Sequence, residues 1–197
     1  MDTPATKSWN QTASGVIEPL AAWATDWPVR TVPEPLDAIF LADATHTYAV
    51  IDAAKVFGLR ELLQASGLEH SCLYLGEAQE QWGDVGPWLV RLDPRHDLTR
   101  RLFLDETDRA ALSFRKGTAL FLTTPDDCAT VLRHLRRFTK VRAEDGRILM
   151  LRFYDSVTFS DLQEVMPRWQ MAEILGQMTV TCLHPDGNWH CTEAVTC

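Results

Sequence analysis

The chain has 197 residues, which is the length of one domain or of one domain with a small attached lobe. Acidic residues outnumber basic ones 27 to 19, and the net charge of −8 argues against a general nucleic-acid binder. Five cysteines, an odd number, fit reduced thiols better than a disulfide framework. We find neither a membrane-spanning run nor a secretory signal, and therefore expect a cytoplasmic protein without membrane insertion.

The charge is distributed unevenly along the chain. Residues 1–90 hold four bases and twelve acids, residues 91–152 hold fourteen bases and nine acids, and residues 153–197 hold one base and six acids. A basic central segment therefore lies between two acidic flanks.

Residues 1–36 are expected to form an irregular arm, because prolines interrupt this segment repeatedly. Four of its apolar residues recur at the spacing of one helix face: Val16, Leu20, Trp23 and Trp27. Two interpretations stay open, namely an arm that packs on its own domain and an apolar segment that is offered to a partner. The domain itself is expected over residues 37–197.

From residue 37 onward, strand and helix patterns alternate. Apolar runs that suit buried strands lie at residues 48–51, 72–75, 88–92 and 119–122. Helices are expected near residues 56–66, with Gly67 as a stop signal, and more weakly over residues 97–113.

The best-marked helix follows the fourth apolar run. Thr124 is the expected N-cap, and Pro125 would occupy the first helical position. The apolar face of this helix comprises Cys128, Val131, Leu132, Leu135 and Phe138, and its basic face comprises Arg133, Arg136, Arg137 and Lys140. The basic face is interpreted either as a solvated surface or as a docking surface for an acidic partner, with phosphate binding as a less favoured alternative.

Two late hairpins are predicted, because an Asp-Gly pair between apolar runs is a strong hairpin signal. The pairs are Asp145-Gly146 and Asp186-Gly187. Between them, Ser160 and Gln163 form a capping box for a helix that Pro167 should kink or divide. We predict an α/β (α+β) fold with a mixed sheet flanked by helices, and residues 156–197 as a possible C-terminal sub-lobe.

The sequence contains no familiar catalytic motif, such as a nucleophile elbow, a phosphate-binding loop or a zinc-protease helix. Asp43, His46 and Asp52 surround the first predicted strand, which leaves an α/β enzyme of unknown reaction as an alternative. We expect a protein that is not an enzyme and that needs no cofactor.

The terminal hairpin carries side chains of the kind that bind zinc: Cys182, His184, His190 and Cys191. A two-residue turn would place Cys182 opposite Cys191, whereas a three-residue turn with a bulge would place Cys182 opposite His190. Pro185 at the first turn position favours the three-residue turn. Metal binding, a disulfide and ordinary strand residues all stay open. The last is favoured, so no metal is predicted, and a metal- or ligand-sensing module remains an alternative function.

Several segments, taken together and in order, resemble the type VI secretion effector-chaperone (adaptor) family, which was long described only as a domain of unknown function. The matching segments are Tyr48–Ala54, Leu73–Glu77, Gly86–Leu92, His134–Phe138, Glu144–Arg147 and Leu151–Asp155. The resemblance covers roughly residues 37–176. It departs from the family pattern at Ser156, where the family usually has proline.

This resemblance implies a non-enzymatic cytoplasmic protein that binds a toxic effector and helps to load it onto the spike protein VgrG. The candidate partner-binding residues are Trp88, Arg133, Arg136, Arg137, Arg152, Tyr154 and Asp155. Strand alternation would place Arg152 and Tyr154 on one side and Phe153 on the other. The first two then either hold the fold together or face a groove for the effector, and Asp155 caps the turn.

Overall fold

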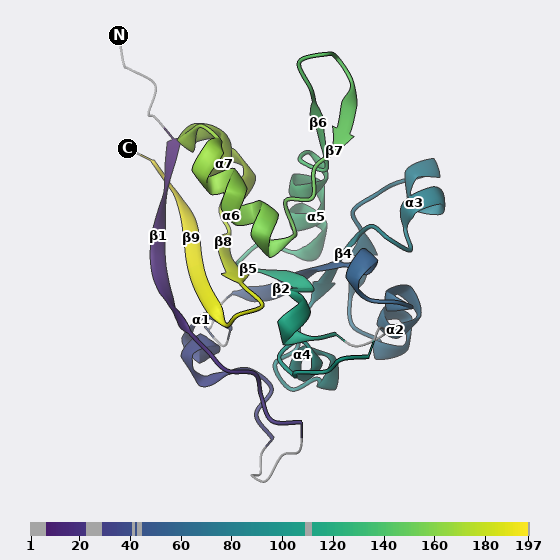
Figure 1. Cartoon of the computed structure of the whole chain (residues 1–197), viewed down its shortest axis with the longest axis vertical. Coiled ribbons are helices and arrows are strands. Elements are labelled where there is room, and N and C mark those ends of the chain that lie inside the picture. The colour runs from purple at the N-terminus through teal and green to yellow at the C-terminus, as the bar shows by residue number, and fades with distance from the viewer. Residues whose placement is uncertain (1–6, 23–28, 41, 43–44, 109–111, 197) are drawn as a thin grey trace.

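The computed structural model describes residues 7–22, 29–40, 42, 45–108 and 112–196. At its centre lies a seven-stranded sheet with the order β1-β9-β8-β5-β2-β4-β3 (Figure 1). Its strands are β1 (Lys7–Val16), β2 (His46–Asp52), β3 (His70–Cys72), β4 (Pro87–Arg91), β5 (Ala119–Thr124), β8 (Thr179–Leu183) and β9 (Asn188–Thr196). The predicted α/β class is confirmed. Each strand pairing described in this sheet is antiparallel, which corrects the predicted mixed sheet.

Helices cover both faces of the sheet: α1 (Asp37–Phe40), α2 (Leu59–Ser66), α3 (Glu77–Trp82), α4 (Asp97–Arg101), α5 (Cys128–Arg136), α6 (Ser156–Val165) and α7 (Arg168–Leu175). Alternate residues of a strand face opposite sides of a sheet. In β2, Tyr48 and Val50 accordingly join the core beneath α5, α6 and α7, whereas Ala49 and Ile51 join the core on the other face. A central strand that is buried on both faces explains the continuous apolar run. None of the described helices is long and apolar enough to cross a membrane.

The predicted strand at residues 72–75 is shifted toward the N-terminus, because β3 ends at Cys72. Cys72 pairs with Trp88 near the start of β4, and the Leu73 amide donates to the Pro87 carbonyl at 2.9 Å. Proline has no amide hydrogen with which to extend the ladder. The weak helix expected over residues 97–113 is confirmed only for α4, which is followed by turns and coil in the described residues.

The irregular arm predicted for residues 1–36 is wrong over residues 7–16, which form β1 as an edge strand along β9. No proline occurs between Pro4 and Pro19, so this segment can pair with the open edge of β9. The predicted helix face is wrong for Val16, which is exposed in β1, and Leu20 forms an isolated bridge with Leu104. Trp23 and Trp27 lie outside the described residues.

Aspartates cap the two helices whose starts were predicted differently. The Asp127 carboxylate, not Thr124, caps α5 by accepting from the Thr130 amide at 2.8 Å. Asp155 caps α6 in the same way by accepting from the Thr158 amide at 3.0 Å. The predicted capping box is therefore wrong, since Ser160 and Gln163 lie inside α6. Pro167 does divide α6 from α7, as predicted.

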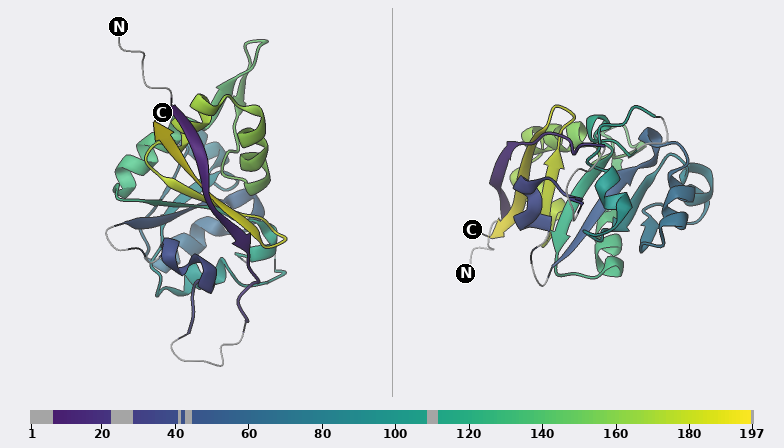
Figure 2. Two further views of the ribbon diagram at one scale, coloured as in Figure 1. Left: turned by 90° about the vertical axis from the view of Figure 1, so that its left-hand side faces the viewer. Right: turned by 90° about the horizontal axis from the view of Figure 1, so that it is seen from below.

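Both predicted hairpins are confirmed, but they lie in different surroundings. The first consists of β6 (Lys140–Arg142) and β7 (Ile148–Met150), which pair only with each other among the described strands. It projects beyond the body of the molecule in Figure 1 and in the left view of Figure 2. We call residues 140–150 the projecting hairpin. The second, formed by β8 and β9, continues the main sheet between β5 and β1; we call residues 179–196 the terminal hairpin.

Candidate functional site

Several exposed apolar side chains gather on the projecting hairpin. Val141, Ile148, Leu149 and Met150 are 38%, 64%, 44% and 43% exposed. Val141 lies opposite Leu149 across the two strands, so this pair shares one face. Ile148 and Met150 lie on the other face, because side chains alternate along a strand. Apolar side chains that gather on an unsupported hairpin are typical of a protein-binding surface.

Basic side chains surround these apolar residues. Lys140, Arg142 and Arg147 lie on the projecting hairpin. Arg133 is exposed on α5, which leads into the hairpin, and Arg137 is exposed directly after α5. Arg147 pairs with Asp145 at 2.7 Å. The other four form no ion pair with any residue that the structure describes. An apolar centre with a basic rim suits a partner whose surface is apolar and acidic.

Arg136 belongs to the fold rather than to the exposed basic face on which it was placed. Its guanidinium donates to the Cys72 carbonyl at 2.9 Å and to the Leu73 carbonyl at 3.2 Å. Burial lowers the pKa of Arg136, which stays protonated at neutral pH. Arg136 thereby joins α5 to the end of β3.

Arg152 forms an ion pair with Asp52, whose side chain is fully buried at the end of β2. The other carboxylate oxygen of Asp52 accepts from the Ala54 amide at 3.1 Å. The Arg152 side chain is about half exposed, at 48%. It therefore neutralises a buried charge and still presents part of its surface to solvent.

A second ion pair lies beside the first. The Asp155 carboxylate pairs with Lys55, whose ammonium also donates to the Gly117 carbonyl at 3.0 Å. Burial alone would raise the pKa of Asp155, but hydrogen bonds from Lys55 and Thr158 lower it below its usual range. The two ion pairs fasten the segment after the projecting hairpin to the end of β2.

Tyr154 lies in the interior and is only 2% exposed. Burial, together with a hydrogen bond to Tyr74, raises its pKa. The strand alternation predicted for Arg152, Phe153 and Tyr154 is wrong, because these residues form a turn. Phe153 and Tyr154 share one core, with their rings edge to face at 5.6 Å.

Trp88 is also buried, at 6% exposed, and its indole donates to the Gly83 carbonyl at 2.8 Å. Among the seven predicted partner-binding residues, Arg133, Arg137 and Arg152 are thus the ones with exposed side chains.

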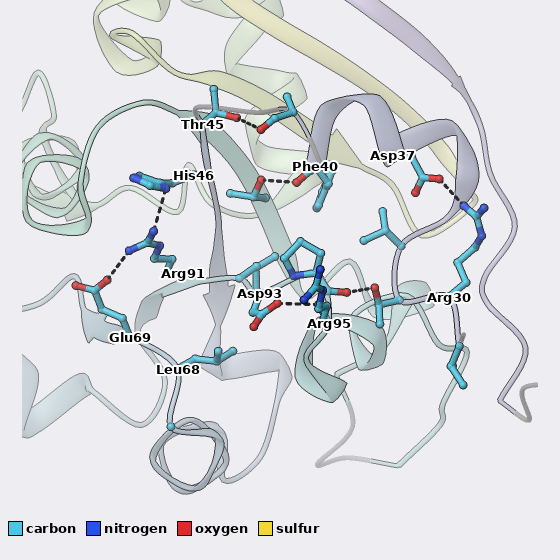
Figure 3. A pocket seen from close by; sticks show the side chains of 18 residues that line it. Arg30, Asp37, Phe40, Thr45, His46, Leu68, Glu69, Arg91, Asp93 and Arg95 are labelled. Atoms are coloured by element: carbon cyan, nitrogen blue, oxygen red, sulfur yellow. Dashed lines mark hydrogen bonds and ion pairs between the residues drawn. The ribbon is translucent and has the colours of Figure 1, made fainter. Parts of the chain in front are cut away.

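A hollow of about 930 Å³ lies where β2 begins and β4 ends (Figure 3). Much of its charge is paired within its own wall. Arg91 lies 3.7 Å from a Glu69 oxygen and 3.0 Å from His46 Nδ1, and Arg30 pairs with Asp37 at 2.6 Å.

The predicted enzyme alternative required Asp43, His46 and Asp52 to converge. His46 lines the hollow, but Asp52 lies at the other end of β2, and six residues of strand span about 20 Å. Asp43 lies outside the described residues. The structure therefore separates His46 from Asp52.

The terminal hairpin resolves the alternatives for its possible ligands. Cys182 lies opposite His190, as the three-residue turn predicted, and Cys191 lies opposite Thr181. The two cysteines contribute to cores on opposite faces of the sheet, and all four cysteines within the described residues are free thiols. The predicted disulfide alternative is therefore not formed.

The apolar residues of the projecting hairpin were not among the predicted site residues. Short apolar runs beside a turn look the same in sequence whether their strands join a sheet or stand alone. Only the pairing of β6 and β7 reveals that these side chains remain uncovered.

Comparisons with known proteins give one match. A family model described as "Domain of unknown function (DUF4123)" matches residues 47–173. No curated protein and no solved structure matches the chain. The matched segment contains the projecting hairpin, the Arg152 and Asp155 ion pairs and Arg136, and it ends before the terminal hairpin.

Proposed function

Because the chain belongs to the family known as DUF4123, a domain of unknown function, we propose that it is a type VI secretion adaptor. In this role it is a non-enzymatic cytoplasmic protein that binds a toxic effector and assists its loading onto the VgrG spike. The motifs that resemble the adaptor family lie within the matched segment, which supports the proposal.

The projecting hairpin is the observation that carries this function. Its four exposed apolar side chains stand clear of the sheet, and its strands pair only with each other among the described elements. Protein interfaces combine a desolvated apolar centre with a polar rim, and a few central side chains contribute most of the affinity. Ile148 and Leu149, one from each face of the projecting hairpin, are the proposed centre for a partner that contacts both faces. The exposed arginines Arg133 and Arg137 are the proposed rim.

The base of the projecting hairpin supports the same role. Arg136 fixes the helix before it, and the Arg152 and Asp155 ion pairs fix the segment after it. A binding element that is held at both ends loses less conformational entropy when its partner docks. Arg136, Arg152 and Asp155 thus position the projecting hairpin, and the exposed residues of that hairpin form the binding surface.

The experiment is co-purification of the tagged protein with the effector encoded beside it. We expect the double substitution Ile148→Asp and Leu149→Asp to weaken effector binding about 10-fold or more, because it places charge at the interface centre. Val165→Asp is the matched control, since Val165 is 75% exposed on α6 and lies away from the projecting hairpin in sequence.

Charge reversal distinguishes the contribution of the basic rim to binding from that of the apolar centre. Arg133→Glu and Arg137→Glu together should slow association and make binding less sensitive to salt. If the effector binds the folded Asp double variant as tightly as it binds the wild type, the proposed interface is wrong. Capture of VgrG is measured separately, with and without effector present.

A further inference from the structure

The face of the terminal hairpin that meets α6 carries a compact set of metal-ligating side chains. Cys182 on β8 lies opposite His190 on β9, and His184 follows Cys182 by two residues, so all three point to one side. The sulfur of Cys182 and one ring nitrogen of each histidine lie within 4.8 Å of one another. This proximity is set by strand register rather than by a flexible loop.

The separations are close to those of a tetrahedral zinc site. Zinc binds thiolate sulfur at about 2.3 Å and imidazole nitrogen at about 2.0–2.1 Å, which places these ligand atoms about 3.5 Å apart in a tetrahedron. Cys182 Sγ and His184 Nε2 are 3.7 Å apart. The His184 and His190 rings are tilted by only 30°, with centroids 5.8 Å apart. The largest of the three donor separations therefore exceeds the tetrahedral value by at most about 1.3 Å.

Residues of α6 complete the surroundings. Ser160 Oγ lies 3.2 Å from His184 Nε2 and 3.8 Å from Cys182 Sγ, beside the donor atoms. Gln163 Oε1 lies 2.9 Å from His190 Nε2, and the Gln163 amide donates to Thr192 Oγ1 at 2.8 Å. A histidine that binds a metal is commonly oriented by a hydrogen bond of this kind to its ring.

The burial of the three side chains gives the cluster both a protected and an accessible side. Cys182 is fully buried and its thiol donates to the Ser156 carbonyl at 3.3 Å, whereas both histidines are partly exposed. Burial raises the pKa of Cys182 to about 12, so the metal-free protein carries a thiol there. A bound metal would displace that proton to solvent and would enter past the histidines.

We propose that Cys182, His184 and His190 bind one zinc ion, with the fourth position filled by water or by Ser160. One thiolate and two imidazoles form a ligand set that zinc accepts readily. The site would lie on the terminal hairpin and is independent of the effector interface proposed above.

The test uses the purified full-length chain, stripped with a chelator and titrated with zinc against a chromophoric competitor. We expect one zinc per chain at low micromolar concentration. Co²⁺ in place of zinc should give the charge-transfer absorption of a thiolate ligand and the visible bands of tetrahedral coordination. Gln163→Ala should weaken zinc binding about 10-fold, as is typical when a residue that orients a ligand is removed.

Variants of the ligands decide between this site and adventitious binding. Cys182→Ser and His184→Ala should each remove the stoichiometric zinc, and Cys182→Ser should remove the thiolate band. Cys191→Ser is the matched control, because Cys191 lies on the opposite face of the same hairpin beside Thr181. If Cys182→Ser fails to fold, His184→Ala decides alone. Absence of stoichiometric zinc in the wild type, or unchanged binding in His184→Ala, overturns the proposal.

Discussion

The two late hairpins have the same turn signal in the sequence, but one stands apart from the main sheet and the other is part of it. Both turn at an Asp-Gly pair with glycine at positive φ, 84° for Gly146 and 94° for Gly187. The projecting hairpin has two strands of three residues, each of them exposed. The terminal hairpin has longer strands that are flanked by β5 and β1. A turn motif therefore specifies a local reversal of the chain, and the neighbouring strands determine whether its side chains are buried or free.

This difference in burial suits the two hairpins to different kinds of ligand. A large partner can reach the projecting hairpin, because its apolar side chains remain uncovered. The terminal hairpin is held between neighbours, and such rigidity suits a small ligand that needs fixed distances.

The largest effect is expected at the base of the projecting hairpin. Arg152→Ala leaves the fully buried Asp52 carboxylate without its cation, and breaking such a pair typically costs about 3–5 kcal/mol. Because the Arg152 side chain is half exposed, water can enter its place and solvate Asp52. We therefore expect the free energy of unfolding to fall by about 3 kcal/mol, the lower end of this range. Urea denaturation measures it, with Arg133→Ala as a surface control that should change stability by less than about 0.5 kcal/mol.

A matched pair of glycine substitutions tests the contrast between the two turns directly. A Cβ at position 187 would lie 2.3 Å from the Ile17 carbonyl oxygen, whereas one at position 146 would meet nothing within 4 Å. Both substitutions carry a left-handed backbone cost of about 1–2 kcal/mol. Gly187→Ala should add an overpacking cost, for a total of about 3 kcal/mol.

Gly146→Ala should lower global stability by less than about 1 kcal/mol, because the projecting hairpin can open without unfolding the sheet. Thermal and urea denaturation of both variants provide the comparison. Equal losses in the two variants would show that the hairpins are coupled to the core to the same degree.

Zinc should stabilise the terminal hairpin selectively. At a free concentration 100 times its dissociation constant, a ligand that binds only the folded state contributes about 2.7 kcal/mol. Hydrogen exchange should show added protection across β8 and β9 and no change in β6 and β7. Removal of the metal with a chelator should reverse the effect, and His184→Ala should show none. Protection that spreads equally to the projecting hairpin would argue against a local site.

Local patterns predicted most of the elements that pack on the sheet, because an element with one buried face has apolar residues at regular intervals in the sequence. The apolar face of α5, the division at Pro167 and both Asp-Gly turns follow from residues close in sequence. By contrast, β1 has few apolar residues and is a strand because β9, more than 170 residues later, provides an open edge. No local pattern within residues 7–16 encodes that partner.

The candidate site divides in the same way. The basic spacing on α5 placed Arg136 beside Arg133 and Arg137, but its guanidinium meets carbonyls that lie more than 60 residues earlier in the chain. By contrast, the register that brings Cys182 opposite His190 follows from the three-residue turn that Pro185 favours, so local residues predicted it. Non-local hydrogen bonds are thus the part of the site that the sequence left open.

The smallest effect concerns the second ion pair at the base of the projecting hairpin. Asp155→Asn keeps a side chain that can cap α6 but removes the charge that faces Lys55, and should cost about 1 kcal/mol at neutral pH. Since the folded-state pKa of Asp155 lies below its unfolded value of about 3.9, this stability is present above that value and is lost as the pH falls through the folded-state pKa. The wild type and the variant should therefore differ in urea denaturation at pH 6 and converge as the pH falls through the folded-state pKa. Asp161→Asn, an exposed substitution on the same helix, should show no such pH-dependent difference. A difference between wild type and Asp155→Asn that persists unchanged in acid would assign the cost to the helix cap and not to the pairing with Lys55.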